Sequence, residues 1–419
     1  MPTTHTLHLG DARAMTAVAD ASVHLVVTSP PYPMIEMWDE AFAAMVPGVA
    51  AQLGAAQGMA AFESMHTALD AVWAECARVL TAGGFLCVNI GDATRTLGGE
   101  FCLYPNHARI ALALMRLGLT PLPDILWRKP TNAPNKFMGS GMLPAGAYVT
   151  YEHEYVLVYR KGGKRSFSEA EKAVRAASAF FWEERNVWFS DVWTDLRGTG
   201  QRLDQDGLRA RSAAFPFELP YRLVNMYSLQ GDTVLDPFVG TGTTMAAAFA
   251  AGRNSVGFDR TVELRPLVAA TLEGAVALGQ RRAEERLAAH RTFVEARVAA
   301  GKVPGHTSTV YGFPVITGQE RELRLLAPQA MAEASVGVWV GECGAATEGA
   351  IVASVATLQK SVATLDASVV GDVATEAVPG GTGASGAPPD AASSAPAARR
   401  GRPPKPPPPA QPGLFNRRG

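Results

Sequence analysis

The sequence predicts an α/β protein built on a mainly parallel sheet with helices on both faces. Strand-like and helix-like segments alternate along residues 1–130, and the alternation resumes after residue 230. This order is typical of a parallel sheet whose connections run through helices. Two polar turns directly follow strand-like segments, and ligands of α/β proteins bind at such carboxyl ends of strands.

The predicted elements follow from the spacing of the apolar residues. Short apolar runs predict buried strands, whereas apolar residues three or four positions apart predict helices with one buried face. The strands are expected at residues 22–28, 83–91, 153–162, 231–238 and 255–259. The helices are expected at residues 68–80, 107–118, 243–252 and 261–300.

Composition and charge argue against several classes of protein. A net charge of −1 over 419 residues argues against a surface that is basic all over, although a local basic groove remains open. The four cysteines lack C-x-x-C spacing, so we expect neither a disulfide framework nor a metal site. No segment has the pattern of a signal peptide or the roughly 18 apolar residues of a membrane span, which predicts a cytoplasmic protein without a membrane partner.

The first polar turn is TSPPY, residues 28–32, directly after the predicted strand at 22–28. Prolines lack an N–H and cannot continue a sheet ladder, so the strand is expected to end in a rigid corner with polar atoms facing outward. A corner that serves only as a turn and a corner that binds a ligand are equally compatible with these residues alone.

The second polar turn lies in the segment DPFVGTGTT, where a strand is expected to end at Asp236. Gly240 and Gly242 then predict a tight turn, and a helix is expected to begin near Thr243. Backbone N–H groups of such a turn face nucleotide-like ligands. Asp259 follows Asp236 by 23 residues and ends the next predicted strand, where a carboxylate can bind ribose hydroxyls.

The chemistry of this turn favours S-adenosylmethionine as the ligand. The segment has no P-loop lysine, which argues against a nucleoside triphosphatase. A carboxylate such as Asp236 would repel a pyrophosphate but attract a cation. S-adenosylmethionine has adenosine at one end and an ammonium and a sulfonium at the other.

Together these segments resemble the amino-methylating DNA methyltransferases of the beta class, and the S-P-P-Y form resembles their N4-cytosine branch. The segments LTAGGFLCVNIGD, WRKP, YEHEYVLVYRKG and AAFPFELPYRLVNMYS stand between the two turns in the order of that family, and the resemblance covers about residues 7–265. It implies a Rossmann-like S-adenosylmethionine-dependent methyltransferase fold with permuted motif order.

The resemblance also implies roles for individual residues. Ser29 Oγ and the Pro30 carbonyl would accept hydrogen bonds from the target amine, Pro31 would stiffen the corner, and Tyr32 would stack on a flipped base. The residues expected to bind the cofactor are Asp11, Phe215, Pro216, Glu218, Asp236, Phe238, Gly240, Gly242, Thr243, Thr244 and Asp259.

Two positions depart from the family pattern. The family usually has Glu where Asp259 stands. It commonly has a histidine just before FPFEL, where this chain has Arg211, Ser212 and Ala213. Both departures leave the affinity for the cofactor open.

The predicted function is a site-specific DNA methyltransferase that flips a cytosine out of duplex DNA and methylates its N4 amine. It would act as the modification enzyme of a restriction–modification system, with a cognate restriction endonuclease as partner, or as an orphan. None of the cysteines follows a proline, which argues against ring-carbon methylation. The alternatives are an N6-adenine methyltransferase and a DNA-binding protein that has lost catalysis.

The resemblance divides the chain into five segments. Residues 1–127 form the catalytic half, 128–210 the target-recognition segment, and 211–300 the cofactor-binding half with a following helix. Residues 301–370 are an accessory region of unknown role, and 371–419 are a disordered tail rich in Ala, Pro and Gly. The predicted DNA contacts are Arg128, Lys129, Lys136, Arg400 and Arg402, because Lys and Arg position phosphates and read guanines.

Two short motifs in the tail suggest partners. Arg400 and Arg402 flank a glycine, as in an AT-hook that lies in a narrow minor groove, which favours association with the nucleoid. The segment QPGLF, from Gln411 to Phe415, resembles the peptide that docks on bacterial sliding clamps.

Overall fold

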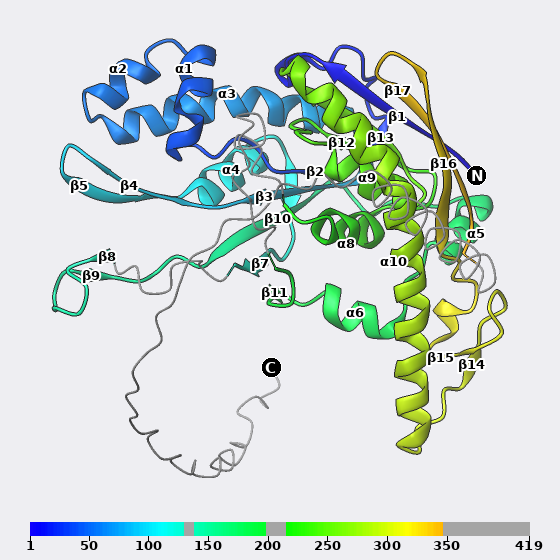
Figure 1. Ribbon diagram of the computed structural model, residues 1–419. Coiled ribbons are helices and arrows are strands. Elements are labelled where there is room, and N and C mark those ends of the chain that lie inside the picture. Colours follow the sequence, from blue (N-terminus) through cyan, green and yellow to red (C-terminus); the bar gives the residue numbers. More distant parts are fainter. Residues whose placement is uncertain (130–137, 198–214, 347–419) are drawn as a thin grey trace, which may run out of the picture. The chain divides into compact units, whose positions relative to one another are not determined.

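A computed structural model describes residues 1–129, 138–197 and 215–346 (Figure 1). The chain separates into the units Met1–Lys360 and Ser361–Gly419, and the second unit lies outside the described residues. The first unit is built on an 11-stranded sheet in the order β11-β7-β10-β3-β2-β12-β13-β1-β17-β16, with β6 paired to β10. Its strands are β1 Pro2–Leu9, β2 Val23–Thr28, β3 Leu80–Ile90, β6 Leu119–Pro121, β7 Ile125–Arg128, β10 His153–Lys161, β11 Val192–Trp193, β12 Thr233–Asp236, β13 Asn254–Asp259, β16 Leu326–Ser335 and β17 Val338–Ala345.

Neighbouring strands at the centre of this sheet run parallel. β3, β2, β12, β13 and β1 pair side by side in one direction. β10 runs antiparallel between β3 and β7. β17 runs antiparallel to β1, and β16 runs antiparallel to β17. The prediction of a mainly parallel α/β sheet is therefore confirmed.

Helices cover both faces of the sheet. The described helices are α1 Asp39–Met45, α2 Val49–Gly54, α3 Gly58–Val79, α4 Asn106–Arg116, α5 Glu169–Ala177, α6 Trp182–Trp188, α8 Glu218–Tyr227, α9 Thr243–Ala250 and α10 Arg265–Ala299. Figure 1 shows α3 on one side of β3 and α8 on the other. Alternate residues of β2 join different cores: Val26 packs in the core that contains α3 and α4, whereas Leu25 and Val27 pack in the core that contains α8 and α9.

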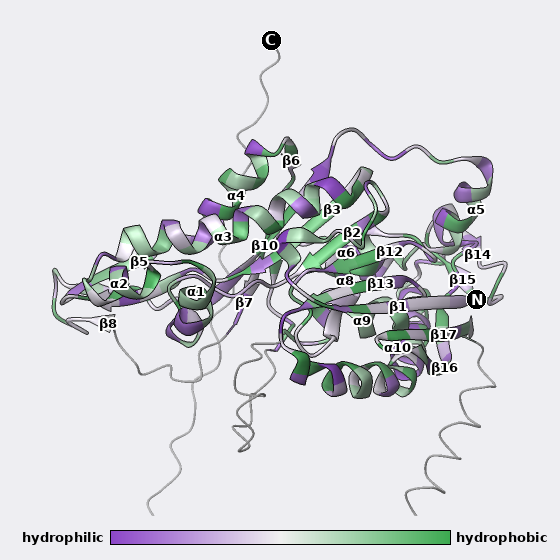
Figure 2. Ribbon diagram, turned by 90° about the horizontal axis from the view of Figure 1, so that it is seen from above, coloured by the Kyte–Doolittle hydropathy of each residue, from purple (hydrophilic) through white to green (hydrophobic). Residues whose placement is uncertain are grey.

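The almost continuous apolar sequence of β2 follows from this double coverage, because a parallel strand buried on both faces has no polar side. Figure 2 shows the hydrophobic colour on β2 and β12 at the centre of the sheet. The predicted helix at 68–80 proves to be the second half of α3, which begins at Gly58. Within the described residues, we find no helix whose length and apolarity would let it cross a membrane.

The strand β1 was not predicted, because its buried face is largely polar. Thr3, His5 and Leu7 point inward from this strand, and only the last of them is apolar. His5 hydrogen-bonds Ser255 Oγ at 2.7 Å and Thr3 Oγ1 at 3.0 Å, and burial lowers its pKa to about 3. A neutral, fully hydrogen-bonded histidine can therefore sit in this interior.

The segments predicted within residues 1–370 do not form separate sheets, because each of them contributes strands to the 11-stranded sheet. β10 and β11 come from residues 128–210, and β16 and β17 come from residues 301–370. The β16–β17 hairpin extends the sheet beyond β1, a placement that the sequence did not predict. Three two-stranded sheets complete the described elements: β4 Ala93–Leu97 with β5 Glu100–Tyr104, β8 Met138–Gly139 with β9 Ala147–Tyr148, and β14 His306–Thr307 with β15 Pro314–Val315.

Candidate active site

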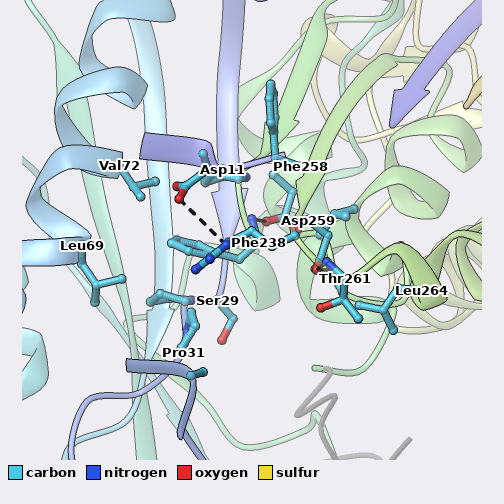
Figure 3. A pocket seen from close by; sticks show the side chains of 18 of the residues that line it. Asp11, Ser29, Pro31, Leu69, Val72, Phe238, Phe258, Asp259, Thr261 and Leu264 are labelled. Atoms are coloured by element: carbon cyan, nitrogen blue, oxygen red, sulfur yellow. Dashed lines mark hydrogen bonds and ion pairs between the residues drawn. The ribbon is translucent and has the colours of Figure 1, made fainter. Parts of the chain in front are cut away.

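The site lies where four adjacent parallel strands end. Ser29 follows β2, Asp236 ends β12, Asp259 ends β13, and Asp11 stands two residues after β1. A cavity of about 460 Å³ opens at this edge (Figure 3). β2 continues through α3 to β3 on one side, whereas β12 continues through α9 to β13 on the other. The cavity therefore lies at a switch point of the sheet, which is where α/β proteins bind ligands.

A direct hydrogen bond joins the two sequence motifs. Thr28 Oγ1 donates to Asp236 Oδ1 at 2.6 Å, across 208 residues of chain. The parallel pairing of β2 with β12 aligns the two strand ends. Ser29, the next residue after Thr28, is thereby held beside the glycine turn.

Asp236 is a buried carboxylate that neutral donors hold in place. Its Oδ1 also accepts from the Phe238 N–H at 3.0 Å, and its Oδ2 accepts from Thr244 Oγ1 at 2.6 Å. Burial raises the pKa of Asp236 to about 6, although these three hydrogen bonds oppose the rise. None of these described donors is a cation, so a ligand with a positive charge would supply the missing counter-charge.

The glycine turn shapes the other half of the cavity. Gly240 has φ +51° and Gly242 has φ +88°, in the left-handed region that favours glycine. Asp259 orders this turn because its carboxylate accepts from the Gly240 N–H at 3.2 Å and from the Thr261 N–H at 2.8 Å. Burial raises the pKa of Asp259 as well. The turn leads into α9, whose first residue is Thr243.

The carboxylate of Asp11 also reaches the cavity wall. It accepts hydrogen bonds from the Arg13 guanidinium at 2.6–3.0 Å, and Arg260 Nε lies 3.9 Å away. The hydrogen bond from Arg13 is the main cause of the lowered pKa of Asp11. Asp11 is therefore ionised and paired, with its neighbouring cations also on the cavity wall.

Apolar side chains complete the cavity. Figure 3 shows Leu69 and Val72 on the α3 side and Leu264 on the opposite side. Phe238 and Phe258 lie between them, and the rings of Trp73 and Phe238 pack in a T-shaped arrangement with 6.1 Å between their centroids. Walls of this kind suit a flat aromatic ring such as adenine. The α3 residues were not predicted from the sequence, because an apolar helix position has the same pattern whether it faces a core or a ligand.

Most of the predicted site residues come together at this cavity. The lining includes Asp11, Ser29, Pro30, Pro31, Tyr32, Phe215, Asp236, Phe238, Gly240, Thr243, Thr244 and Asp259. Pro216, Glu218 and Gly242 do not line it. The Glu218 carboxylate instead binds Arg222 at 2.9 Å and Arg282 at 2.8 Å, on α8 and α10.

Behind the proline corner, Ser29 and Tyr32 belong to a hydrogen-bonded group with Asn89 and Glu154, two residues that were not predicted from the sequence. Ser29 Oγ donates to the Tyr32 hydroxyl at 3.1 Å, and this hydroxyl donates to Glu154 Oε2 at 3.0 Å. Asn89 Nδ2 donates to both Tyr32 and Glu154, at 2.9 and 2.7 Å. Asn89 and Glu154 belong to the strand segments VNIGD and HEYVLVY, where polar residues within apolar strands were the available signal.

Two of the predicted DNA contacts are described. The Arg128 side chain is 62% exposed and pairs with Glu152 at 3.5 Å. Lys129 is 41% exposed and donates to Glu154 Oε1 at 2.6 Å, so it also belongs to the group behind the corner. Lys136, Arg400, Arg402 and the segment from Gln411 to Phe415 lie outside the described residues.

A second cluster of titratable groups lies away from the cavity, among Glu183, His290 and Glu320. His290 Nδ1 donates to Glu183 Oε1 at 2.8 Å, and Nε2 donates to the Pro314 carbonyl at 3.0 Å. Burial opposes the charge, but the Glu183 carboxylate raises the pKa of His290 above its ordinary value. Both ring nitrogens therefore act as donors, and the cluster is a hydrogen-bonded ion pair.

Comparisons with known proteins agree with this geometry. The type II methyltransferase M.MthZI of Methanothermobacter thermautotrophicus is 48% identical over 331 residues, which is 78% of this chain and 92% of that protein. M.MjaI of Methanocaldococcus jannaschii, also a type II methyltransferase, is 46% identical over 277 residues, 64% of this chain and 90% of its own.

A solved structure shares the fold. TTHA0409, a candidate DNA modification methylase of Thermus thermophilus crystallised with S-adenosyl-L-methionine, aligns with a TM-score of 0.51 and 34% identity. The alignment covers 65% of this chain and 94% of that one. The sequence profile of the N6/N4 DNA methylases, described as DNA methylase, matches residues 23–269, the stretch that contains both turns. This protein therefore belongs to the N6/N4 family of amino-methylating DNA methyltransferases.

Proposed function

We propose that this protein transfers a methyl group from S-adenosylmethionine to the exocyclic N4 amine of cytosine in duplex DNA. The observation that carries the proposal is the juxtaposition at one cavity of the Ser29–Tyr32 corner with Asp236, held by the Thr28–Asp236 hydrogen bond of 2.6 Å. A group that would accept hydrogen bonds from an amine therefore lies beside a group that would attract a cation.

S-adenosylmethionine is the cofactor that fits the donors on this cavity. When bound, it supplies an electrophilic methyl group on a sulfonium. Asp236, whose hydrogen-bond donors Thr28, Phe238 and Thr244 are all neutral, would face the cationic end of the cofactor. Asp259 would accept hydrogen bonds from the ribose, and Leu69, Val72 and the neighbouring phenylalanines would enclose the adenine.

The proline corner would bind the target amine. The lone pair of an exocyclic amine is delocalised into the ring, which makes the nitrogen a poor nucleophile. Ser29 Oγ and the Pro30 carbonyl would accept the two N–H bonds and favour a pyramidal nitrogen. Their fixed positions would contribute to the rate by orientation, because the corner cannot flex. Tyr32 would stack on the flipped base.

Serine at the first position of the corner supports cytosine as the target. The first position in the usual adenine-N6 form is an aspartate, which this chain lacks at residue 29. The similarity to M.MthZI and M.MjaI supports a type II restriction–modification role, with an endonuclease as the partner. We further propose that Arg128 and Lys129 contact DNA, together with Lys136 and the tail arginines Arg400 and Arg402. The segment QPGLF would bind a sliding clamp.

Mass spectrometry of nucleosides tests the proposal. Unmethylated DNA of varied sequence is incubated with the protein and S-adenosylmethionine labelled with a deuterated methyl group. Labelled N4-methylcytosine is the expected product, and Ser29→Ala should make very little of it. Labelled N6-methyladenine would show that the target base is adenine and not cytosine. A wild-type protein that binds DNA but leaves it unlabelled would be a binding protein.

A further inference from the structure

The Tyr32 hydroxyl lies at the centre of a buried chain of hydrogen bonds that leads from the cavity to Glu154. These hydrogen bonds join three parts of the fold: the corner after β2, β3 at Asn89 and β10 at Glu154. Asn89 is 3% exposed, and the Glu154 side chain is 14% exposed. Buried polar groups of this kind are costly unless each is hydrogen-bonded. Their presence behind a reactive corner therefore calls for a role.

The chemistry of the acceptor fixes the direction of these bonds. An ionised carboxylate only accepts, so Tyr32 must donate its single hydroxyl hydrogen to Glu154 Oε2. Because that hydrogen is committed, Ser29 must donate to the Tyr32 oxygen, at 3.1 Å. The Ser29 oxygen, which lies on the cavity wall, then has its lone pairs free for an incoming N–H. Glu154 therefore sets Ser29 as an acceptor toward the cavity.

Lys129 and Asn89 hold the Glu154 side chain in place. Lys129 Nζ donates to Oε1 at 2.6 Å, and Asn89 Nδ2 donates to Oε2 at 2.7 Å. The side chains of Tyr32 and Glu154 pack closely against Gly91. A Cβ at this position would lie 3.1 Å from the Tyr32 ring and 3.3 Å from Glu154 Cγ.

We propose that Ser29, Tyr32 and Glu154 form a relay that removes the proton from the target amine, with Glu154 as its final acceptor. The proposal rests on the proposed function and names the destination of the proton that methylation must release. Serine by itself is too weak a base to keep that proton. Glu154 acts through Tyr32 and does not touch the base, so it is a positioning residue.

The atoms and charges of the step balance. The nitrogen–methyl bond forms as the sulfonium–methyl bond breaks. The amine proton moves to Ser29 Oγ, the hydroxyl proton of Ser29 moves to the Tyr32 oxygen, and the phenolic proton of Tyr32 moves to Glu154 Oε2. One positive charge on sulfur and one negative charge on Glu154 disappear together, and both hydroxyls end neutral.

The protons must move together along this chain. Burial, with the Glu154 charge as a further cause, raises the pKa of Tyr32 well above its ordinary value, so a free phenolate is not formed. The relay also gives a role to the Tyr32 hydroxyl, which stacking on a base does not require.

The test compares Glu154→Gln with Tyr32→Phe in single-turnover methylation. Each change keeps the shape of the side chain but breaks the relay, and Tyr32→Phe keeps the ring for stacking. Each should lower the rate about a hundredfold, the lower end of general acid–base effects. The double variant should lose no more than either single variant. If Glu154 and Tyr32 act independently, the two losses will multiply.

Three readouts separate the relay from a structural role. The affinity for the cofactor by calorimetry, and the fluorescence of 2-aminopurine at the target position as a measure of base flipping, should stay within twofold of wild type. Solvent deuterium should slow the wild type more than either variant.

Two control variants are matched to the two test variants, and different results would contradict the relay and the proposed function. Glu63→Gln removes a carboxylate from the Arg109 pair on α3 and α4, and Tyr159→Phe removes a hydroxyl elsewhere on β10, so both should methylate at the wild-type rate. A wild-type rate in Glu154→Gln or Tyr32→Phe would overturn the relay alone. Absence of methylation by the wild-type protein would instead overturn the proposed function, and the relay with it.

Discussion

Asp236 should make cofactor binding depend on pH, and Asp236→Asn should remove that dependence. Its pKa of about 6 leaves about one carboxylate in ten ionised at pH 5. If only the ionised form binds the cationic end of the cofactor, the affinity should fall about tenfold between pH 8 and pH 5, or about 1.4 kcal/mol. Binding at pH 5 should also release close to one proton.

Titration calorimetry with S-adenosylmethionine measures both quantities. The affinity is measured at pH 5 and pH 8 in two buffers of different ionisation enthalpy, for the wild type and for Asp236→Asn. The variant should bind weakly at both pH values, without linked proton release. An affinity of the wild type that stays flat from pH 5 to pH 8, or a variant with the same pH dependence as the wild type, would refute the reasoning.

Asp236 should also make the stability of the cofactor-free protein depend on pH. The pKa of Asp236 is raised from 3.8 to about 6, so between these pH values the folded protein holds a proton that the unfolded chain has lost. Rising pH therefore removes stability across this window, by a total of about 3 kcal/mol for a shift of about two units. Thermal melts at pH 4 and pH 8 should show the wild type losing most of this amount relative to Asp236→Asn, which cannot ionise.

Three further changes test the packing and the ion pairs. Gly91→Ala places a methyl group 3.1 Å from the ring of the corner tyrosine and should lower single-turnover methylation about tenfold with unchanged cofactor affinity; an unchanged rate would contradict the close fit. His290→Phe should destabilise the protein more at pH 6 than at pH 9 in thermal melts. Because the pKa of His290 is raised in the folded protein, its ion pair with Glu183 stabilises the fold fully below about pH 6.5. This stabilisation is lost as the pH rises through the pKa of the folded state. An equal loss of stability at both pH values would therefore exclude a charged histidine. Arg286→Met leaves the Glu184 carboxylate, 2.6 Å from Arg286 Nε, without its buried partner and should cost about 3–5 kcal/mol in urea unfolding. Adding Glu184→Leu should recover most of that loss, and no recovery would contradict a buried unpaired charge as the cause.

Much of the site was predictable from the sequence because its chemistry is local. A proline pair must end a strand, and a glycine pair after Asp236 must turn the chain, whatever surrounds them. These constraints act within a few residues, so TSPPY and DPFVGTGTT identify two strand ends and two kinds of ligand group. The predicted strands at 22–28 and 231–238 are found as β2 and β12 for the same reason.

Other features depend on contacts between distant residues. The buried face of β1 is polar, so its pattern does not distinguish a strand, and only pairing with β13 and β17 on either side makes it one. The β16–β17 hairpin likewise gains its place from the edge that β1 offers. The apolar residues of α3 on the cavity wall have the same sequence pattern as those in the core.

The sequence by itself determined the family, the two strand-end motifs and the type of cofactor, because each depends on residue chemistry over a short span of chain. Only the tertiary structure decided that Thr28 hydrogen-bonds Asp236 and that Tyr32 hydrogen-bonds Glu154. It also decided that Glu218 pairs with Arg222 and Arg282 and does not line the cavity. The physical reason is that hydrogen bonds and burial depend on distance in space. Only the folding of the sheet brings together groups that lie 122 and 208 residues apart in the chain.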